Sequence, residues 1–174
     1  MTNSRRTPPP LDAAMLQNLA LRYVERFATT RGKLADYLAR KVRERGWTGP
    51  MLEPASVAER MAGLGYVDDR AFAEARARSL SRRGYGARRV SQALRAAHVE
   101  EADAAPAIEQ SADDAFASAL AFARRRRFGP YATATADERH IQRQIAAMLR
   151  AGHSFALARR IVAAAPGEVL EAEH

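Results

Sequence analysis

The titratable side chains that could carry out catalysis are few in this sequence and stand apart from one another. There are four histidines and no cysteine. His98 and His153 each stand where a helical pattern ends, which favours interaction with the last turn of a helix over a catalytic role. His140 and His174 complete the set, and no pair of histidines has the spacing of a zinc site. We therefore expect no catalytic residue, no metal and no cofactor.

Two pairs of carboxylates, Asp68-Asp69 and Asp113-Asp114, are the other candidates for chemistry. Paired carboxylates serve in metal binding and in acid–base catalysis. Each pair, however, directly precedes a helical pattern, where an aspartate accepts hydrogen bonds from the free amides of the first turn. The sequence also lacks a glycine-rich loop of the kind that holds nucleotide phosphates. We predict that the protein is not an enzyme.

The charge balance indicates an anionic partner. The chain has 28 Lys and Arg against 20 Asp and Glu, a net charge of +8, and Lys33 and Lys41 are its only lysines. Codon bias in a GC-rich genome would explain the choice of arginine, but not the excess of positive charge. The arginine fork suits phosphates and carboxylates, so nucleic acid or an acidic protein surface is the expected partner. Apolar runs are short and interrupted by arginine, which predicts a cytoplasmic protein.

Arginines gather around the segment Gly84-Tyr85-Gly86 and again in Arg124–Arg127. Arg88 and Arg89 follow the first segment, in the opening turn of a predicted helix, where the helix dipole disfavours cations. An external anion would explain them better than local helix energetics. At Arg124–Arg127, which ends a helical pattern, a structural role and a binding role remain equally open. The predicted partner-binding residues are Arg76, Arg82, Arg83, Tyr85, Arg88, Arg89, Arg124, Arg125, Arg126 and Arg127. A third basic region in the last part of the chain comprises Arg139, Arg143, Arg150, Arg159 and Arg160.

The first of the elements that must position these arginines is a helix over about 70–83. Asp68 or Asp69 would cap it. Phe72 is followed at i+3 and i+7 by Ala75 and Ser79, and we predict that this narrow stripe is its buried face.

A glycine hinge and a second helix follow. Gly84 stands where the first helix should end, since a left-handed closing residue is easiest for glycine. The next helix is predicted over about 87–97, with Val90 and Leu94 on its buried face. The three residues from Gly84 to Gly86 are interpreted as a tight glycine hinge with Tyr85 exposed.

The remaining patterns also predict helices and no strands. Asp12, then Thr29 or Thr30, then Ser56 would cap the first three. These further helices are expected over about 13–28, 32–45, 56–63, 102–110, 114–127, 137–151 and from 154 to before Pro166.

An internal repeat divides the chain. Asp69-x-x-Phe72-Ala73 recurs 44 residues later as Asp113-x-x-Phe116-Ala117. We therefore predict an all-α fold of three tandem three-helix modules in an elongated arrangement. The expected divisions are a flexible leader at 1–11, modules at 12–65, 66–111 and 112–166, and an acidic tail at 167–174.

The phrases Gly65–Ala73 and Gly84–Leu94 together resemble the signature of the RecX family, small bacterial regulators of the RecA recombinase. The resemblance extends over about 12–166. The signature residues, for which the resemblance implies a structural role, are Gly65, Tyr66, Asp68, Asp69, Phe72, Gly84, Gly86, Val90 and Leu94.

The resemblance implies a function as well as a fold. RecX proteins bind the RecA nucleoprotein filament, inhibit strand exchange and ATP hydrolysis, and so moderate DNA repair, recombination and the SOS response. We expect such a regulator here, acting as a monomer in the cytoplasm, with RecA and single- or double-stranded DNA as partners. The alternative from the residues is a helix-turn-helix protein that binds DNA directly.

Overall fold

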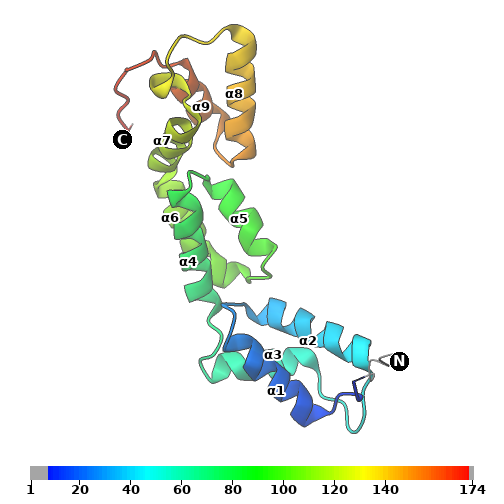
Figure 1. Cartoon of the computed structure of the whole chain (residues 1–174). Helices are drawn as coiled ribbons and strands as arrows, with labels where there is room; N and C mark the ends of the chain where they lie inside the picture. Colours follow the sequence, from blue (N-terminus) through cyan, green and yellow to red (C-terminus); the bar gives the residue numbers. More distant parts are fainter. Residues whose placement is uncertain (1–7, 173–174) are drawn as a thin grey trace, which may run out of the picture. The chain divides into compact units, whose positions relative to one another are not determined.

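The computed structural model describes residues 8–172. Within them the chain forms nine α-helices and a short 3-10 helix, η1, and no β-strand. The all-α prediction is confirmed, and the helices follow one another in three sets of three (Figure 1). The elements are α1 (Ala13–Val24), α2 (Arg31–Arg45), α3 (Pro54–Gly63), α4 (Asp69–Arg82), α5 (Ala87–Arg95), α6 (Glu101–Asp113), α7 (Ala115–Arg126), η1 (Gly129–Tyr131), α8 (Glu138–Arg150) and α9 (Phe155–Ala163).

The described residues pack as two units. The first contains 8–72 together with Ala97–Glu100, and the second contains Ala73–Ala96 together with the residues from Glu101 onward. The elongated arrangement and the predicted module boundaries stay predictions. Pro8 to Leu11 precede α1, and Leu11 is fully buried in the core of the first unit, where its backbone bonds to Gly46 and Thr48.

Polar side chains begin the first two helices as predicted. Asp12 accepts a hydrogen bond from the amide of Met15 at 2.8 Å, and Thr30 accepts one from the amide of Lys33 at 3.1 Å. The predicted cap at Ser56 is wrong, because α3 begins two residues earlier, at Pro54. Proline lacks an amide hydrogen and has a helical φ, so it suits a first helical position without a side-chain cap.

The buried face of α4 differs from the predicted stripe. Ala75 is exposed, while Ala73, Ala77 and Leu80 are buried at i, i+4 and i+7. Phe72, the largest apolar side chain at this end of the helix, is only half-buried. The helix therefore buries its alanines, which allow a close approach of neighbouring backbones, and the stripe built on Phe72 is wrong. On α5 the prediction is confirmed, since Val90 and Leu94 are fully buried.

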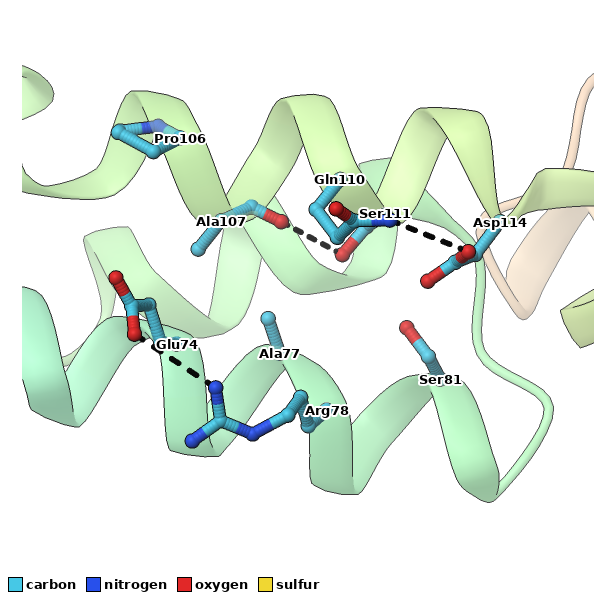
Figure 2. Close-up of a pocket in the computed structure, with 9 residues that line it drawn as sticks. All are labelled: Glu74, Ala77, Arg78, Ser81, Pro106, Ala107, Gln110, Ser111 and Asp114. Carbon is cyan, nitrogen blue, oxygen red and sulfur yellow. Dashed lines mark hydrogen bonds and ion pairs between the residues drawn. The ribbon is translucent and has the colours of Figure 1, made fainter.

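A pocket of about 480 Å³ lies between α4 and α6 (Figure 2). Ala77 and Ala107 form part of its lining, and several of its polar groups already have partners. Gln110 bonds to Asp114 at 3.3 Å, and the hydroxyl of Ser111 donates to the carbonyl of Ala107 at 2.8 Å. This pocket therefore presents mainly small and locally satisfied side chains, with little excess charge.

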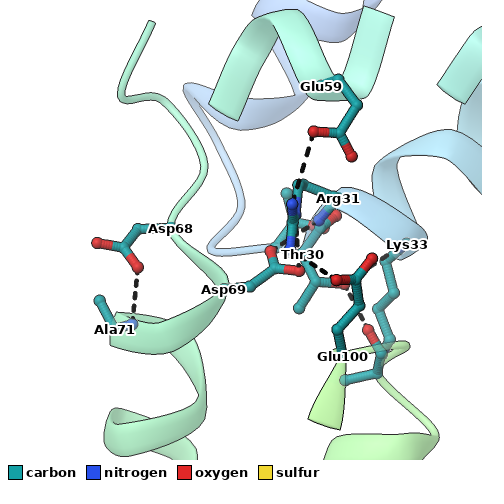
Figure 3. A network of polar contacts seen from close by, with 10 residues as sticks. Thr30, Arg31, Lys33, Glu59, Asp68, Asp69, Ala71 and Glu100 are labelled. Atoms are coloured by element: carbon teal, nitrogen blue, oxygen red, sulfur yellow. Dashed lines mark hydrogen bonds and ion pairs between the residues drawn. The ribbon is translucent and has the colours of Figure 1, made fainter. Parts of the chain in front are cut away.

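Asp69 is the centre of a polar network in the first unit (Figure 3). Its carboxylate, with only 2% of the side chain exposed, accepts the backbone amide of Arg31 at 2.9 Å and its Nε at 3.3 Å. The Arg31 guanidinium also reaches Glu59 at 3.5 Å and Glu100 at 3.7 Å. The hydrogen bond to Asp69 is the main reason why the pKa of Arg31 is raised. Asp68 instead caps α4, accepting the amide of Ala71 at 2.8 Å. The two adjacent aspartates thus have different structural roles.

Candidate partner-binding surface

The turn between α4 and α5 is tightly packed against other parts of the same unit. Gly84 has φ +80°, and a Cβ added there would lie 2.6 Å from the backbone nitrogen of Phe122. Gly86 donates its amide to the carbonyl of Ala151 at 2.9 Å, and a Cβ there would lie 2.5 Å from the carbonyl oxygen of Gly152. The prediction that Gly84 ends the first helix in a left-handed conformation is confirmed, and both glycines also allow α7 and the α8–α9 turn to approach the backbone closely. Contacts with residues far away in the sequence fix the position of Tyr85.

Tyr85 is half-buried, not exposed, and lies beside two arginines, one just after α4 and one on α7. The guanidinium carbon of Arg83 is 5.6 Å from its ring centroid, and that of Arg125 is 5.9 Å away. Both distances are within the range of cation–π attraction. The ring therefore holds together the arginines that follow α4 and those that end α7.

On one side of this contact lies a groove of about 820 Å³. Phe122 and two alanines contribute apolar surface, and Tyr85 lies at its edge with the arginines. Its cationic lining comes from three helices and consists of Arg89, Arg125, Arg126 and Arg150.

A second groove of about 520 Å³ shares Arg125 with the first. Here Leu120 and two alanines are apolar, and the guanidinium of Arg124 lies 5.1 Å from the ring centroid of Tyr131. Arg82 and Arg83 complete the cationic lining. We call the cationic and tyrosine lining of the two grooves the basic band: Arg82, Arg83, Tyr85, Arg89, Arg124, Arg125, Arg126, Tyr131 and Arg150.

The seven arginines of the basic band are all exposed, and none forms an ion pair with another residue in the range 8–172. The guanidinium of Arg89 donates to the neutral side chain of Gln92, at 3.4 Å. Arg82, Arg150 and the arginines of α7 stand in last turns, where the helix dipole stabilises cations. Arg89 stands in a first turn, where the dipole opposes it. Seven neighbouring positive charges without carboxylates form a surface suited to a polyanion or an acidic protein.

The structure brings together seven of the ten predicted partner-binding residues. Arg76, Arg88 and Arg127 are exposed but line neither groove. Arg150, which the sequence assigned to the third basic region, belongs to the basic band instead. Tyr131 was not predicted, because its sequence neighbours carry no signal of the contact with Arg124. Arg82 and Arg124 are also far apart in the sequence, so the sequence did not predict that they line the same groove.

The other signature residues have mixed environments. Gly65 has φ +80° and no described atom within 4 Å of an added Cβ, so its role is the backbone turn alone. Tyr66 is 54% exposed and therefore contributes little to a core.

His153 is buried just after α8, and its backbone amide donates to the carbonyl of Met148 at 3.1 Å, so it interacts with the last turn of that helix as predicted. Its Nε2 donates to the carbonyl of Gly84 at 2.9 Å, and its ring centroid is 5.9 Å from that of Phe122. Its Nδ1 is buried and has no hydrogen-bond partner among the described residues. Burial lowers the pKa of His153, and the bond to Gly84 opposes this only in part. His98 does follow a helix, with φ 56°, and lies 3.3 Å from Asp36.

We expect stability to fall as the pH decreases from 7 to 5. The folded pKa of His153 lies below the ordinary value of 6.5, so below that pH the unfolded chain takes up a proton that the folded chain resists. The stabilisation is complete above pH 6.5 and is lost as the pH falls toward the folded pKa. Urea unfolding at pH 7, 6 and 5 would measure the loss. His153→Gln should reduce the dependence of stability on pH. If the variant shows the same dependence as the unmodified protein, groups other than His153 cause it.

No helix within residues 8–172 is long and apolar enough to span a membrane. Helices in three successive sets of three and a concentrated band of arginines define an all-helical protein with a strongly basic surface region. Comparison with known proteins agrees with this class. The sequence model described as RecX, second three-helix domain, matches residues 68–108, which include both glycines of the α4–α5 turn.

Curated relatives match over nearly the full chain. Regulatory protein RecX of Myxococcus xanthus is 31% identical, covering 91% of this chain and 90% of that protein. Regulatory protein RecX of Halorhodospira halophila is 36% identical, covering 86% and 88%. The crystal structure of RecX from Lactobacillus salivarius has a TM-score of 0.60 at 17% identity, covering 86% of this chain and 93% of that one. The chain belongs to the RecX family of regulatory proteins.

Proposed function

We propose that this chain binds the RecA filament on single-stranded DNA and inhibits its ATP hydrolysis and strand exchange, thereby moderating DNA repair, recombination and the SOS response. The observation that carries the proposal is the basic band, in which seven exposed arginines lie together without a carboxylate partner among the described residues. Membership of the RecX family supports a regulatory role and supports RecA as the partner.

The chemistry of the basic band suits a nucleoprotein. Arginine forks bind both carboxylates and phosphates, often with two parallel hydrogen bonds. A filament offers both groups, on protein surfaces and on the DNA backbone. Tyr85 and Tyr131 add rigid aromatic surface of the type enriched at interface hot spots. A filament also repeats its surface, so that weak contacts made by linked helical sets multiply into useful affinity.

The proposed role is binding rather than catalysis, and the proposed site of action is the cytoplasm, where RecA meets DNA. A monomer with several contact regions is sufficient for this binding role. Binding across neighbouring RecA protomers would explain inhibition at less than one copy per protomer.

The test is the single-stranded-DNA-dependent ATPase activity of RecA as this protein is added at ratios well below one per RecA. We expect a clear fall in the rate at such ratios. An unchanged rate, together with tight and steeply salt-dependent binding to duplex DNA, would contradict the proposal and favour the direct DNA-binding alternative.

A further inference from the structure

A second surface of unusual composition lies in the first unit, apart in sequence from the basic band. Tyr23 on α1 and Tyr37 on α2 stack with ring centroids 4.3 Å apart. Phe27, just after α1, lies 5.1 Å from Tyr23 and is 55% exposed. The two tyrosines are half-buried against the core of this unit, and Tyr23 is the one that contacts the phenylalanine. More than half of the Phe27 side chain is therefore open to solvent beside this stacked pair.

Cations surround these rings. Arg40 and Lys41 lie 5.7 and 6.0 Å from the ring centroid of Tyr37. Lys33 and Arg43 line a groove of about 430 Å³ together with the two stacked tyrosines. All four cations belong to α2, and Lys33 and Arg43 are separated by about 15 Å along its axis. The groove thus has positive charge at both ends and aromatic surface along its wall.

Only some of the positive charges in and around this groove are paired with a carboxylate. Glu44 binds Lys41 at 2.7 Å and Arg40 at 3.7 Å. Asp36, the acid in the groove lining, lies 3.3 Å from His98. Lys33 and Arg43 have no carboxylate partner among residues 8–172. These two are the cations available for an external anion.

We propose that this surface binds single-stranded nucleic acid, with a base stacked on Phe27 and backbone phosphates at Lys33 and Arg43. Single strands are bound by this combination of aromatic platforms and cationic grooves. An acidic peptide would use the cations but would leave the exposed aromatic ring without a matching flat partner. The proposal depends on local contacts in the first unit and holds whether or not the basic band binds RecA.

The test compares fluorescence anisotropy titrations of a labelled oligo-dT with those of an abasic strand of equal length. Any contact of the basic band with phosphates would be the same for both strands, so the difference between their affinities reports stacking. Phe27→Ala is the variant, and its matched control is Phe155→Ala, because Phe155 is 57% exposed and lies in the other unit. Both phenylalanines are exposed, so neither change should unfold the protein.

For the unmodified protein we expect oligo-dT to bind more tightly than the abasic strand. Phe27→Ala should weaken oligo-dT binding by about fivefold or more while leaving the abasic affinity unchanged. Phe155→Ala should change neither affinity. Equal affinity for the two strands, or equal effects of the two substitutions, would overturn the proposal and favour an acidic protein as the ligand of this surface.

Discussion

Replacing Gly84 with alanine is expected to destabilise the second unit by about 3 kcal/mol. A left-handed backbone costs an alanine about 1–2 kcal/mol, and overpacking typically adds about 1–3 kcal/mol. Both causes apply, since Gly84 has φ +80° and its Cβ would lie 2.6 and 2.8 Å from backbone atoms of Phe122. Differential scanning calorimetry should show a fall in the unfolding temperature of that unit of about 12–24 °C.

Gly65→Ala is the control that separates the two causes. Gly65 also has φ +80°, but an added Cβ would meet no described atom within 4 Å. This substitution should therefore destabilise its unit by about 1–2 kcal/mol, which is the cost of a left-handed backbone alone. Gly86→Ala tests packing alone, because φ at Gly86 is −84°. If Gly84→Ala and Gly65→Ala reduce the free energy of unfolding by equal and small amounts, the turn between α4 and α5 is not closely packed.

Asp69→Ala is expected to destabilise the first unit by about 2–3 kcal/mol. The buried carboxylate accepts two hydrogen bonds from Arg31, one of them from a backbone amide in the first turn of α2. Its removal leaves that amide without its partner and takes away one of the carboxylates around a partly buried guanidinium. Urea unfolding monitored by helical circular dichroism would measure the loss.

Asp68→Ala is the matched comparison, because the two aspartates are adjacent but differ in burial. Asp68 is exposed and caps α4, so its loss should cost about 1 kcal/mol. The loss of stability for Asp69→Asn should lie between the losses for the two alanine variants. The amide oxygen of asparagine can still accept one hydrogen bond, but it carries no charge. A loss for Asp68→Ala as large as that for Asp69→Ala would show that Asp69 contributes only as a helix-terminal residue.

Local signals in the sequence were sufficient for most of the helices. Caps such as Asp12 and Thr30, and the i, i+4 pair Val90 and Leu94, act within a single helix, so their effect can be predicted from nearby residues. On α4 the same reasoning failed, because size suggested Phe72 while close packing selected the alanines. Choosing between faces of a helix requires knowledge of the neighbour, which a single sequence does not contain.

The sequence predicted which types of residue form the candidate site, but not which individual residues line it. The clusters around Tyr85 and at the end of α7 were apparent, yet only the fold shows that Arg83 and Arg125 contact the same ring. Arg88 is next to Arg89 in sequence, but successive residues of a helix point about 100° apart, and only Arg89 lines a groove. Gly84 and Gly86 were interpreted as a hinge for the same reason: the backbones that require them are at Phe122 and Gly152.

The most direct measurement for the central claim is the affinity of the labelled protein for preformed RecA filaments on single-stranded DNA. The basic-band variant is Arg83→Ala with Arg125→Ala, and the control is Arg60→Ala with Arg139→Ala, which removes the same charge from exposed arginines elsewhere. We predict that the first pair weakens binding about tenfold or more, as expected for interface hot spots, while the control stays close to the unmodified protein. Equal weakening by both pairs, or no weakening by either, would contradict the assignment of the basic band as the filament-binding surface.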